Sequence, residues 1–244
     1  MEPSTYLEHL RNDGDRLAAV AQEAPKAAVT SCPGWDMTEL LTHVGGVHRW
    51  VGQIVASKST TYRKGESEPP EGFDAALGWY KEGLTALLAT LGATDPDEQV
   101  WNWADRAPAP ARFWFRRMAH ETAIHRWDAE SAADDPHPLA ADLAVDGIDE
   151  FLGFVGLWLA NSPVAGLAGS LHLHATDTAG EWSLQLQPGH LDLRREHVKS
   201  DVAMRGSASD LCLWVVNRVP ADSTRFQIFG DTEILQTWRE LKFT

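Results

Sequence analysis

The sequence predicts an α+β protein, in which a four-helix bundle is followed by a small α+β domain. Apolar residues recur at helical spacing through four long segments of the first half. From about residue 170 the apolar period changes to two, the period of β-strands. The two patterns meet at the stretch ADDPHP, so we expect domains at 1–135 and 136–244.

The first helix is expected over residues 3–23, where apolar side chains recur three and four residues apart. The segment TSCPGWD then ends the pattern, because it contains Pro33 and Gly34. A second helix is expected over about 37–56. Asp36 is its predicted N-cap, since a glutamate three residues later completes a capping box.

Two further helices complete the predicted bundle. One covers about 73–92 after a polar loop, and the other covers about 111–133 after a loop rich in Pro and Asp. Four helices joined by connections of mixed length are typical of a four-helix bundle.

The second half is predicted to begin with a helix over about 138–160. The segments SLHLHAT and EWSLQLQ are joined by DTAG, which indicates a β-hairpin. A strand near 201–205 leads into a helix in SASDLCLWVVNRV. A strand in RFQIF then leads into a final helix, DTEILQTWREL, with Asp231 as its N-cap.

Composition and charge exclude several classes of protein. No apolar run approaches the roughly 18–20 residues that cross a bilayer, and the N-terminal stretch lacks the features of a secretory signal. We therefore expect a cytoplasmic protein without membrane association. The formal net charge of −14 disfavours nucleic acid as a partner. Two distant cysteines, Cys32 and Cys212, exclude a disulfide scaffold.

The fourth helix carries a carboxylate and an imidazole four residues apart. Glu121 and His125, in AHETAIHRWD, share a helix face with Trp114 and Met118. An ionised carboxylate on this apolar stripe must find a cation or strong hydrogen-bond donors. One alternative is an i,i+4 ion pair with Arg117, which contributes only about 0.2–0.5 kcal/mol in water. The other is a metal site that needs a third ligand.

The second helix offers this ligand. His43 lies on or beside the apolar face of that helix, next to Gly45 and Gly46, which permit the close approach of another helix or of a ligand. From two facing helices, His43, Glu121 and His125 supply two nitrogens and one carboxylate oxygen. This set suits a divalent metal such as Zn²⁺ and leaves a coordination position open for water, thiolate or substrate.

Other histidines fit a metal site less well. His48 and His120 lie five residues from His43 and His125, so neither shares a helix face with its neighbour. His120 is expected to pack or to support the site. The HLH sequence at 172–174 places two imidazoles on one strand face, but without a third ligand nearby an exposed strand face is favoured. Four more are interpreted as surface residues: His9, His137, His190 and His197.

Two helical segments resemble the signatures of a known family. TSCPGWDMTELLTHVGGVHRW and RRMAHETAIHRWDAE look like those of the mycothiol-dependent maleylpyruvate isomerase family, within the DinB-like metalloprotein superfamily. The segment VAMRGSASDLCLWVVNRVPADSTRFQIFGDTEILQTW is similar to the C-terminal domain of that family, which is related in shape to sterol-carrier-like domains. The resemblance covers nearly the whole chain.

The resemblance implies a metal, usually Zn²⁺, held by His43, Glu121 and His125. It also implies mycothiol, a thiol of actinobacterial cytoplasm, as a cofactor. In the characterised member of the family, the thiol adds to a cis-enoyl diacid, the former double bond rotates, and loss of the thiol gives the trans isomer. The metal lowers the pKa of the thiol, and the thiolate is the nucleophile. Related branches transfer thiols to electrophiles, so we expect an isomerase or transferase of a small molecule, as a monomer or homodimer.

The substrate does not follow from the resemblance. Arg205 and Arg218 are candidates for binding its acidic group, although a surface charge or helix-end partner is favoured for both. Cys32 in CPGW is interpreted as a packed turn residue rather than a reactive thiol. Two alternatives remain: a non-catalytic, metal-stabilised binding or regulatory protein on the same scaffold, and a structural Glu121–Arg117 pair without metal.

Overall fold

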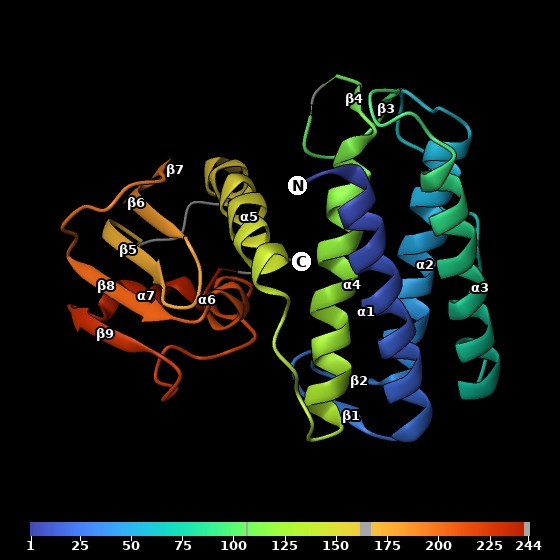
Figure 1. Cartoon of the computed structure of the whole chain (residues 1–244), viewed down its shortest axis with the longest axis horizontal. Helices are drawn as coiled ribbons and strands as arrows, with labels where there is room; N and C mark the ends of the chain where they lie inside the picture. The colour runs from blue at the N-terminus through green and yellow to red at the C-terminus, as the bar shows by residue number, and fades with distance from the viewer. Residues whose placement is uncertain (106, 162–166, 242–244) are drawn as a thin grey trace. The chain divides into compact units, whose positions relative to one another are not determined.

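The computed structural model describes residues 1–105, 107–161 and 167–241 (Figure 1). The chain forms two compact units, Met1–His137 and Pro138–Thr244. Helices fill the first unit and a mixed sheet with helices forms the second, so the predicted α+β class is confirmed. A domain division after residue 135 stays a prediction. None of the described helices is long and apolar enough to cross a membrane.

The described part of the first unit contains four helices, α1 (Pro3–Glu23), α2 (Met37–Ala56), α3 (Phe73–Gly92) and α4 (Arg112–Ala132). Their bounds match the predicted ones to within one residue. Both α1 and α2 pack against α3 and α4, which gives a four-helix bundle (Figure 1). Their apolar stripes form the core, as Leu10, Leu17, Leu40, Leu41 and Leu87 show by being almost fully buried.

The N-terminus of α2 is fixed by the predicted capping box. The Asp36 carboxylate accepts from the backbone N–H of Glu39 at 3.2 Å, and the Glu39 carboxylate accepts from that of Asp36 at 2.9 Å. Just before it, the two-residue strands β1 (Ala28–Val29) and β2 (Trp35–Asp36) pair with each other. This pairing closes the CPGW turn, where Gly34 has a left-handed φ of 88°.

Gly45 shows why α2 needs a small residue. A Cβ at Gly45 would lie 2.8 Å from the Trp79 ring and 3.3 Å from the Tyr80 Cα atom. The close approach predicted at the two glycines is therefore confirmed at Gly45, and the approaching element is helix α3. At Gly46 the Trp79 ring lies at an ordinary contact distance of 3.8 Å.

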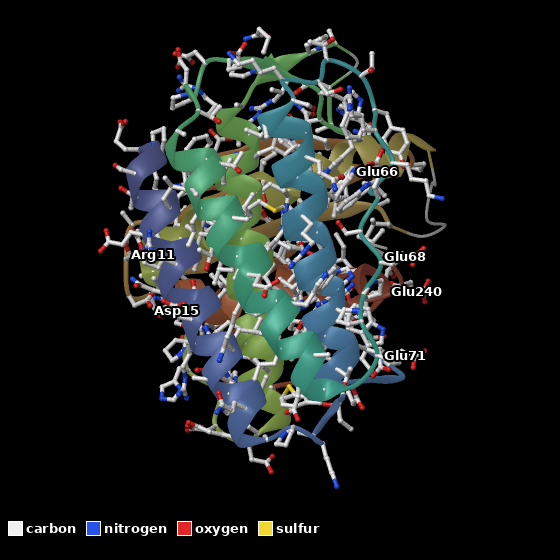
Figure 2. The ribbon with its side chains drawn as sticks, turned by 90° about the vertical axis from the view of Figure 1, so that its right-hand side faces the viewer. Arg11, Asp15, Glu66, Glu68, Glu71 and Glu240 are labelled. Carbon is white, nitrogen blue, oxygen red and sulfur yellow. The ribbon has the colours of Figure 1, made fainter. Side chains whose placement is uncertain are left out.

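The acidic composition is visible on the surface of the first unit. Figure 2 shows Glu66, Glu68 and Glu71 along the connection between α2 and α3, where all three are exposed. Arg11 and Asp15 project from α1 and are also exposed. The absence of a nucleic-acid partner stays a prediction.

The second unit is built on a five-stranded sheet in the order β7-β6-β5-β8-β9 (Figure 1). Its strands are β5 (Gly169–Ala175), β6 (Glu181–Gln187), β7 (His190–Arg194), β8 (Val202–Gly206) and β9 (Gln227–Gly230). β5 and β6 form the predicted antiparallel hairpin, and β8 runs parallel to β5. Helix α6 (Ala208–Val215) contacts β5 and β8, while α5 (Ala141–Asn161) contacts α6 and β7.

Several predicted bounds in this unit are wrong. Helix α5 begins at Ala141, three residues later than predicted, and before it the Leu139 N–H donates to the Ser209 hydroxyl at 2.9 Å. Helix α6 ends four residues early, since Asn217 has a left-handed φ of 61°. The final helix, α7 (Glu233–Trp238), has Thr232 as its N-cap; Asp231 instead accepts from the Glu233 N–H. Strand β7 was not predicted.

Two short strands also precede α4. β3 (Gln99–Val100) pairs antiparallel with β4 (Ala109–Pro110). Such two-residue ladders, like that of β1 and β2, are too short to show a period in the sequence.

Candidate metal centre

The three predicted ligands meet between α2 and α4, which are neighbours in the bundle. The Nε2 atom of His43 lies 3.3 Å from Oε1 of Glu121, and Nε2 of His125 lies 3.4 Å from the same oxygen. One donor atom from each residue lies within 4.8 Å of the other two. The convergence that the sequence analysis required is therefore present.

The second oxygen of Glu121 is held by an arginine. Arg117 donates from Nη2 to Oε2 of Glu121 at 3.1 Å, which is the i,i+4 contact considered from the sequence. Burial raises the pKa of Glu121, but hydrogen bonds from His125 and His43 outweigh it, so this pKa lies well below its usual value. The ion pair and the ligand cluster use different oxygens and are compatible with each other.

His125 is oriented from its other ring nitrogen. Its Nδ1 atom lies 2.9 Å from Oδ2 of Asp128, whose side chain is fully buried. Burial lowers the pKa of His125, but hydrogen bonds with Asp128, Cys32 and Glu121 raise it well above its usual value. A carboxylate on Nδ1 is the usual partner of a metal-binding imidazole, because it fixes the ring and leaves Nε2 directed at the cation.

The sequence analysis missed two residues at this cluster and understated a third. Asp128 was signalled only by its place three residues after His125, on the same side of the helix. Trp35 lies with its ring 4.8 Å from that of His43 and 6.1 Å from that of His125, measured between centroids. Cys32 is a turn residue as expected, yet its Sγ lies 3.7 Å from Oδ2 of Asp128.

Cys32, His125 and Asp128 form a second group whose donor atoms lie within 4.8 Å of one another. This group shares His125 with the first but faces its Nδ1 side, where the Asp128 contact already satisfies the ring. The His43 side is the more accessible one, because the side chains of His43, Glu121 and His125 are 37%, 22% and 7% exposed. The open side of the cluster therefore lies toward α2.

The other helical histidines serve packing. His120 is 4% exposed and contacts the Tyr6 ring edge-on at 6.2 Å. His48 is fully buried, with Nε2 at 2.9 Å from the Thr122 hydroxyl. Burial lowers the pKa of His48 to about 3, so the ring is neutral.

The predicted residues of the second unit have mixed outcomes. Arg205 is exposed on β8, and Arg218, after α6, donates to the Val216 carbonyl at 3.2 Å. A role for either in substrate binding stays a prediction. The expectation of an exposed strand face at HLH is wrong for His172, which is 4% exposed and has the His197 ring 4.8 Å away.

The donor set of the first cluster fits a divalent cation. Two imidazole nitrogens and one carboxylate oxygen on fixed helices match the three-ligand pattern of catalytic zinc sites. The buried partners Asp128 and Arg117 supply the outer contacts that such ligands require.

Two family models match the chain, and together they cover most of it. The model of the mycothiol maleylpyruvate isomerase N-terminal domain matches residues 7–130, and that of the C-terminal domain matches residues 142–237. A crystal structure of mycothiol-dependent maleylpyruvate isomerase superposes with a TM-score of 0.65 at 14% identity, covering 93% of each chain. A histidine-to-alanine mutant of a mycothiol-dependent maleylpyruvate isomerase gives 0.62 at 13% identity, again over 93% of each chain.

No curated protein sequence matches the chain. The two structural likenesses show a shared fold at these identities, and the family models carry the assignment. The chain belongs to the mycothiol-dependent maleylpyruvate isomerase family.

Proposed function

We propose that the protein is a metal- and thiol-dependent enzyme, either an isomerase of the maleylpyruvate type or a transferase of a thiol to an electrophile. In this proposal His43, Glu121 and His125 hold the metal. The observation that carries it is the convergence of two Nε2 atoms on Oε1 of Glu121 from two helices. Family membership supports the type of reaction.

Zn²⁺ is the cation that best fits two nitrogens and one oxygen. When bound, it would supply Lewis acidity, which lowers the pKa of a thiol so that the nucleophilic thiolate forms near neutral pH.

The chain's own residues prepare this site in two ways. Arg117 and Asp128 hold Glu121 and His125 from their far sides, so the inward atoms need little reorganisation. Trp35 covers both imidazoles on a third side. The exposed part of His43 then leaves one direction of approach for a thiol and a small electrophile.

Protons must leave when a cation enters. Without metal, Glu121 is ionised and His125 is protonated, and these charges balance within the cluster. A cation on Nε2 of His125 displaces the proton on that atom, while Asp128 keeps the proton on Nδ1 in place. Metal binding is therefore expected to release protons and to weaken in acid.

The remaining parts of the proposal come from the family. We propose mycothiol as the thiol cofactor and an electrophilic small molecule, such as a cis-enoyl diacid, as the substrate, in the cytoplasm of an actinobacterium and as a monomer or homodimer. Arg205 and Arg218 remain the candidates for contacting an acidic substrate.

The test is metal content and turnover in tag-free protein purified without chelator. We expect His43→Ala and His125→Ala each to lower the content by one divalent ion per chain and to abolish turnover of electrophiles with mycothiol. His190→Ala, at an exposed histidine of β7, is the control and should change neither. Wild-type protein with no stoichiometric metal contradicts the proposal. Bound metal without turnover of any thiol and electrophile supports the non-catalytic alternative.

A further inference from the structure

A second group of imidazoles lies on one face of the sheet in the Pro138–Thr244 unit. Strand alternation puts His172 and His174 on the opposite face of β5 from Leu171 and Leu173. Across the β5–β6 ladder, Glu181 stands directly opposite His174. The segment between β7 and β8 brings a third imidazole, that of His197, to the same place.

Glu181 is the centre of this group. Its Oε1 atom lies 2.6 Å from Nδ1 of His174 and 3.0 Å from Nδ1 of His197. The His197 ring is nearly perpendicular to that of His172, at 83° and 4.8 Å between centroids. Donor atoms of His172, Glu181 and His197 all lie within 4.8 Å of one another.

His172 is left with an unused ring nitrogen. The residue is 4% exposed, and its buried Nε2 atom has no hydrogen-bond partner. Burial, together with the nearby His197, lowers the pKa of His172, so the ring is neutral near pH 7. A buried polar atom without a partner costs free energy, and a neutral imidazole nitrogen is the form that binds metals.

An open cavity of about 850 Å³ gives access to the group. His172, His174 and His197 line it, as do Lys199 and Arg205. The positive charges of Lys199 and Arg205 are offset by Asp201, which also lines the cavity, and by Glu181 of the adjacent group.

We infer that His172, Glu181 and His197 form a second divalent-cation site, of the Zn²⁺ class, in which His174 positions Glu181. Zinc ligands at about 2.1 Å in a tetrahedron stand about 3.4 Å apart, and the 3.0 Å between Glu181 and His197 is already close to that spacing. The other donor atoms of the set lie within 4.8 Å of one another, and the largely exposed His197 can move to close the set around a cation.

A simple ion pair would not explain the group as well. Hydrogen bonds from His174 and His197 can both be accepted by the same oxygen of Glu181, but they leave the buried Nε2 atom of His172 without a partner. A cation with two nitrogen ligands and one oxygen ligand accounts for all three residues at once.

The test counts Zn²⁺ per chain in tag-free, chelator-treated protein titrated against a chromophoric chelator. The first site is removed with His43→Ala and His125→Ala together, and we expect one ion per chain to remain. Adding His197→Ala or Glu181→Gln should weaken this binding at least about 100-fold. Replacing a residue that contacts only a ligand, and not the metal, weakens binding by about 10–100-fold, so a larger loss identifies a direct ligand. His197 is 73% exposed, so its replacement leaves the fold intact.

His190→Ala is the matched control, an exposed histidine one strand away from the cavity. Retained helicity and sheet content by circular dichroism show that each variant is folded. The inference is overturned if the double variant binds no ion, or if His197→Ala and Glu181→Gln leave its binding unchanged. In the wild-type background, His197→Ala should lower the Zn²⁺ content from two ions per chain to one. Loss of an ion in His43→Ala reports only on the bundle site, so the proposed function and this inference can be contradicted independently of each other.

Discussion

The two units of the chain each bring two histidines and a glutamate together, but they support them differently. In the bundle, the donors stand on two helices, and the outer atoms of Glu121 and His125 are held by Arg117 and Asp128, which are 9% and 0% exposed. In the sheet, Glu181 is held by imidazoles, and one donor, His197, is 73% exposed on a connecting segment. The same donor set is thus rigid in one place and loose in the other.

This difference has a consequence for binding. A site whose ligands are fixed before the cation arrives loses less conformational entropy on binding than one that must close. We therefore expect the bundle cluster to bind a cation more tightly than the sheet cluster. Each of the following predictions tests one part of this contrast.

The first effect, of about the same size as the second, concerns the buried neutral histidine near each cluster. His48 in the bundle is fully buried, and burial lowers its pKa from 6.5 to about 3. Between pH 6.5 and about pH 3, His48 binds a proton in the unfolded chain but not in the folded chain. The unfolding free energy therefore decreases as the pH falls below 6.5. Between pH 7 and pH 5 this loss is about 2 kcal/mol.

We expect His48→Gln to remove this loss from the pH profile of unfolding free energy, measured with urea on metal-free protein. His172→Gln should flatten the profile by less, because the pKa of His172 is lowered too but the residue keeps a slight exposure. A wild-type profile parallel to that of His48→Gln contradicts the burial argument. His48 also shows that a buried, unpartnered ring nitrogen alone makes no site: its Nδ1 has no hydrogen-bond partner, yet none of the groups of possible metal ligands among the described residues includes it.

The next effect concerns the carboxylate behind His125. Asp128→Asn keeps the shape of the side chain but removes the negative charge of the carboxylate that contacts Nδ1 of His125. Such a change typically weakens metal binding about 10–100-fold, or about 1.4–2.7 kcal/mol. We expect this loss in Zn²⁺ competition titrations on a His197→Ala background, where the sheet cluster no longer contributes.

His174→Gln is the matching change in the sheet. Glu181 takes the place there that Glu121 has in the bundle, and the Nδ1 atom of His174 lies 2.6 Å from its Oε1 atom. It should weaken the sheet site by less than Asp128→Asn weakens the bundle site, because His174 is 28% exposed whereas Asp128 is fully buried. Equal losses would show that the two clusters are supported alike.

The sequence could predict the bundle cluster because helical periodicity is local. Glu121 and His125 are four residues apart, and the apolar stripe of α4 tells which way they point. His43 required only that α2 and α4 be neighbours. Asp128 was visible at the right spacing, yet nothing in the sequence separates a buried orienting acid from a solvated one.

The sheet cluster was harder for a physical reason. The hairpin turn DTAG sets the register that places Glu181 opposite His174, and this signal was present in the sequence. His197, however, comes from a segment without a period, so its position depends on tertiary structure alone. The same limit explains the missed strand β7 and the early end of α6, where a single left-handed residue, Asn217, decides the boundary.

The smallest effect separates ligands on a helix from ligands on a connecting segment. Asp36 caps α2, and Asp36→Ala should cost about 1 kcal/mol of unfolding free energy. His43 lies two turns further along that helix, so Zn²⁺ binding at the bundle should stay unchanged. Asp201 ends the segment that carries His197, and its carboxylate accepts from the N–H and the hydroxyl of Ser170, each at 2.8 Å.

Asp201→Ala frees this segment, and we expect it to weaken Zn²⁺ binding at the sheet several-fold in the double variant that lacks the bundle site. The two substitutions thus form a matched pair. Asp36→Ala lowers the unfolding free energy without changing Zn²⁺ affinity, whereas Asp201→Ala lowers Zn²⁺ affinity because it releases the segment that carries His197. Thermal unfolding and chelator competition on both variants measure the two effects. The contrary outcome is that Asp36→Ala weakens Zn²⁺ binding at the bundle site as much as Asp201→Ala weakens it at the sheet site. A ligand in the middle of a helix would then be no better fixed than a ligand on a connecting segment, and the contrast between a rigid and a loose cluster would be wrong.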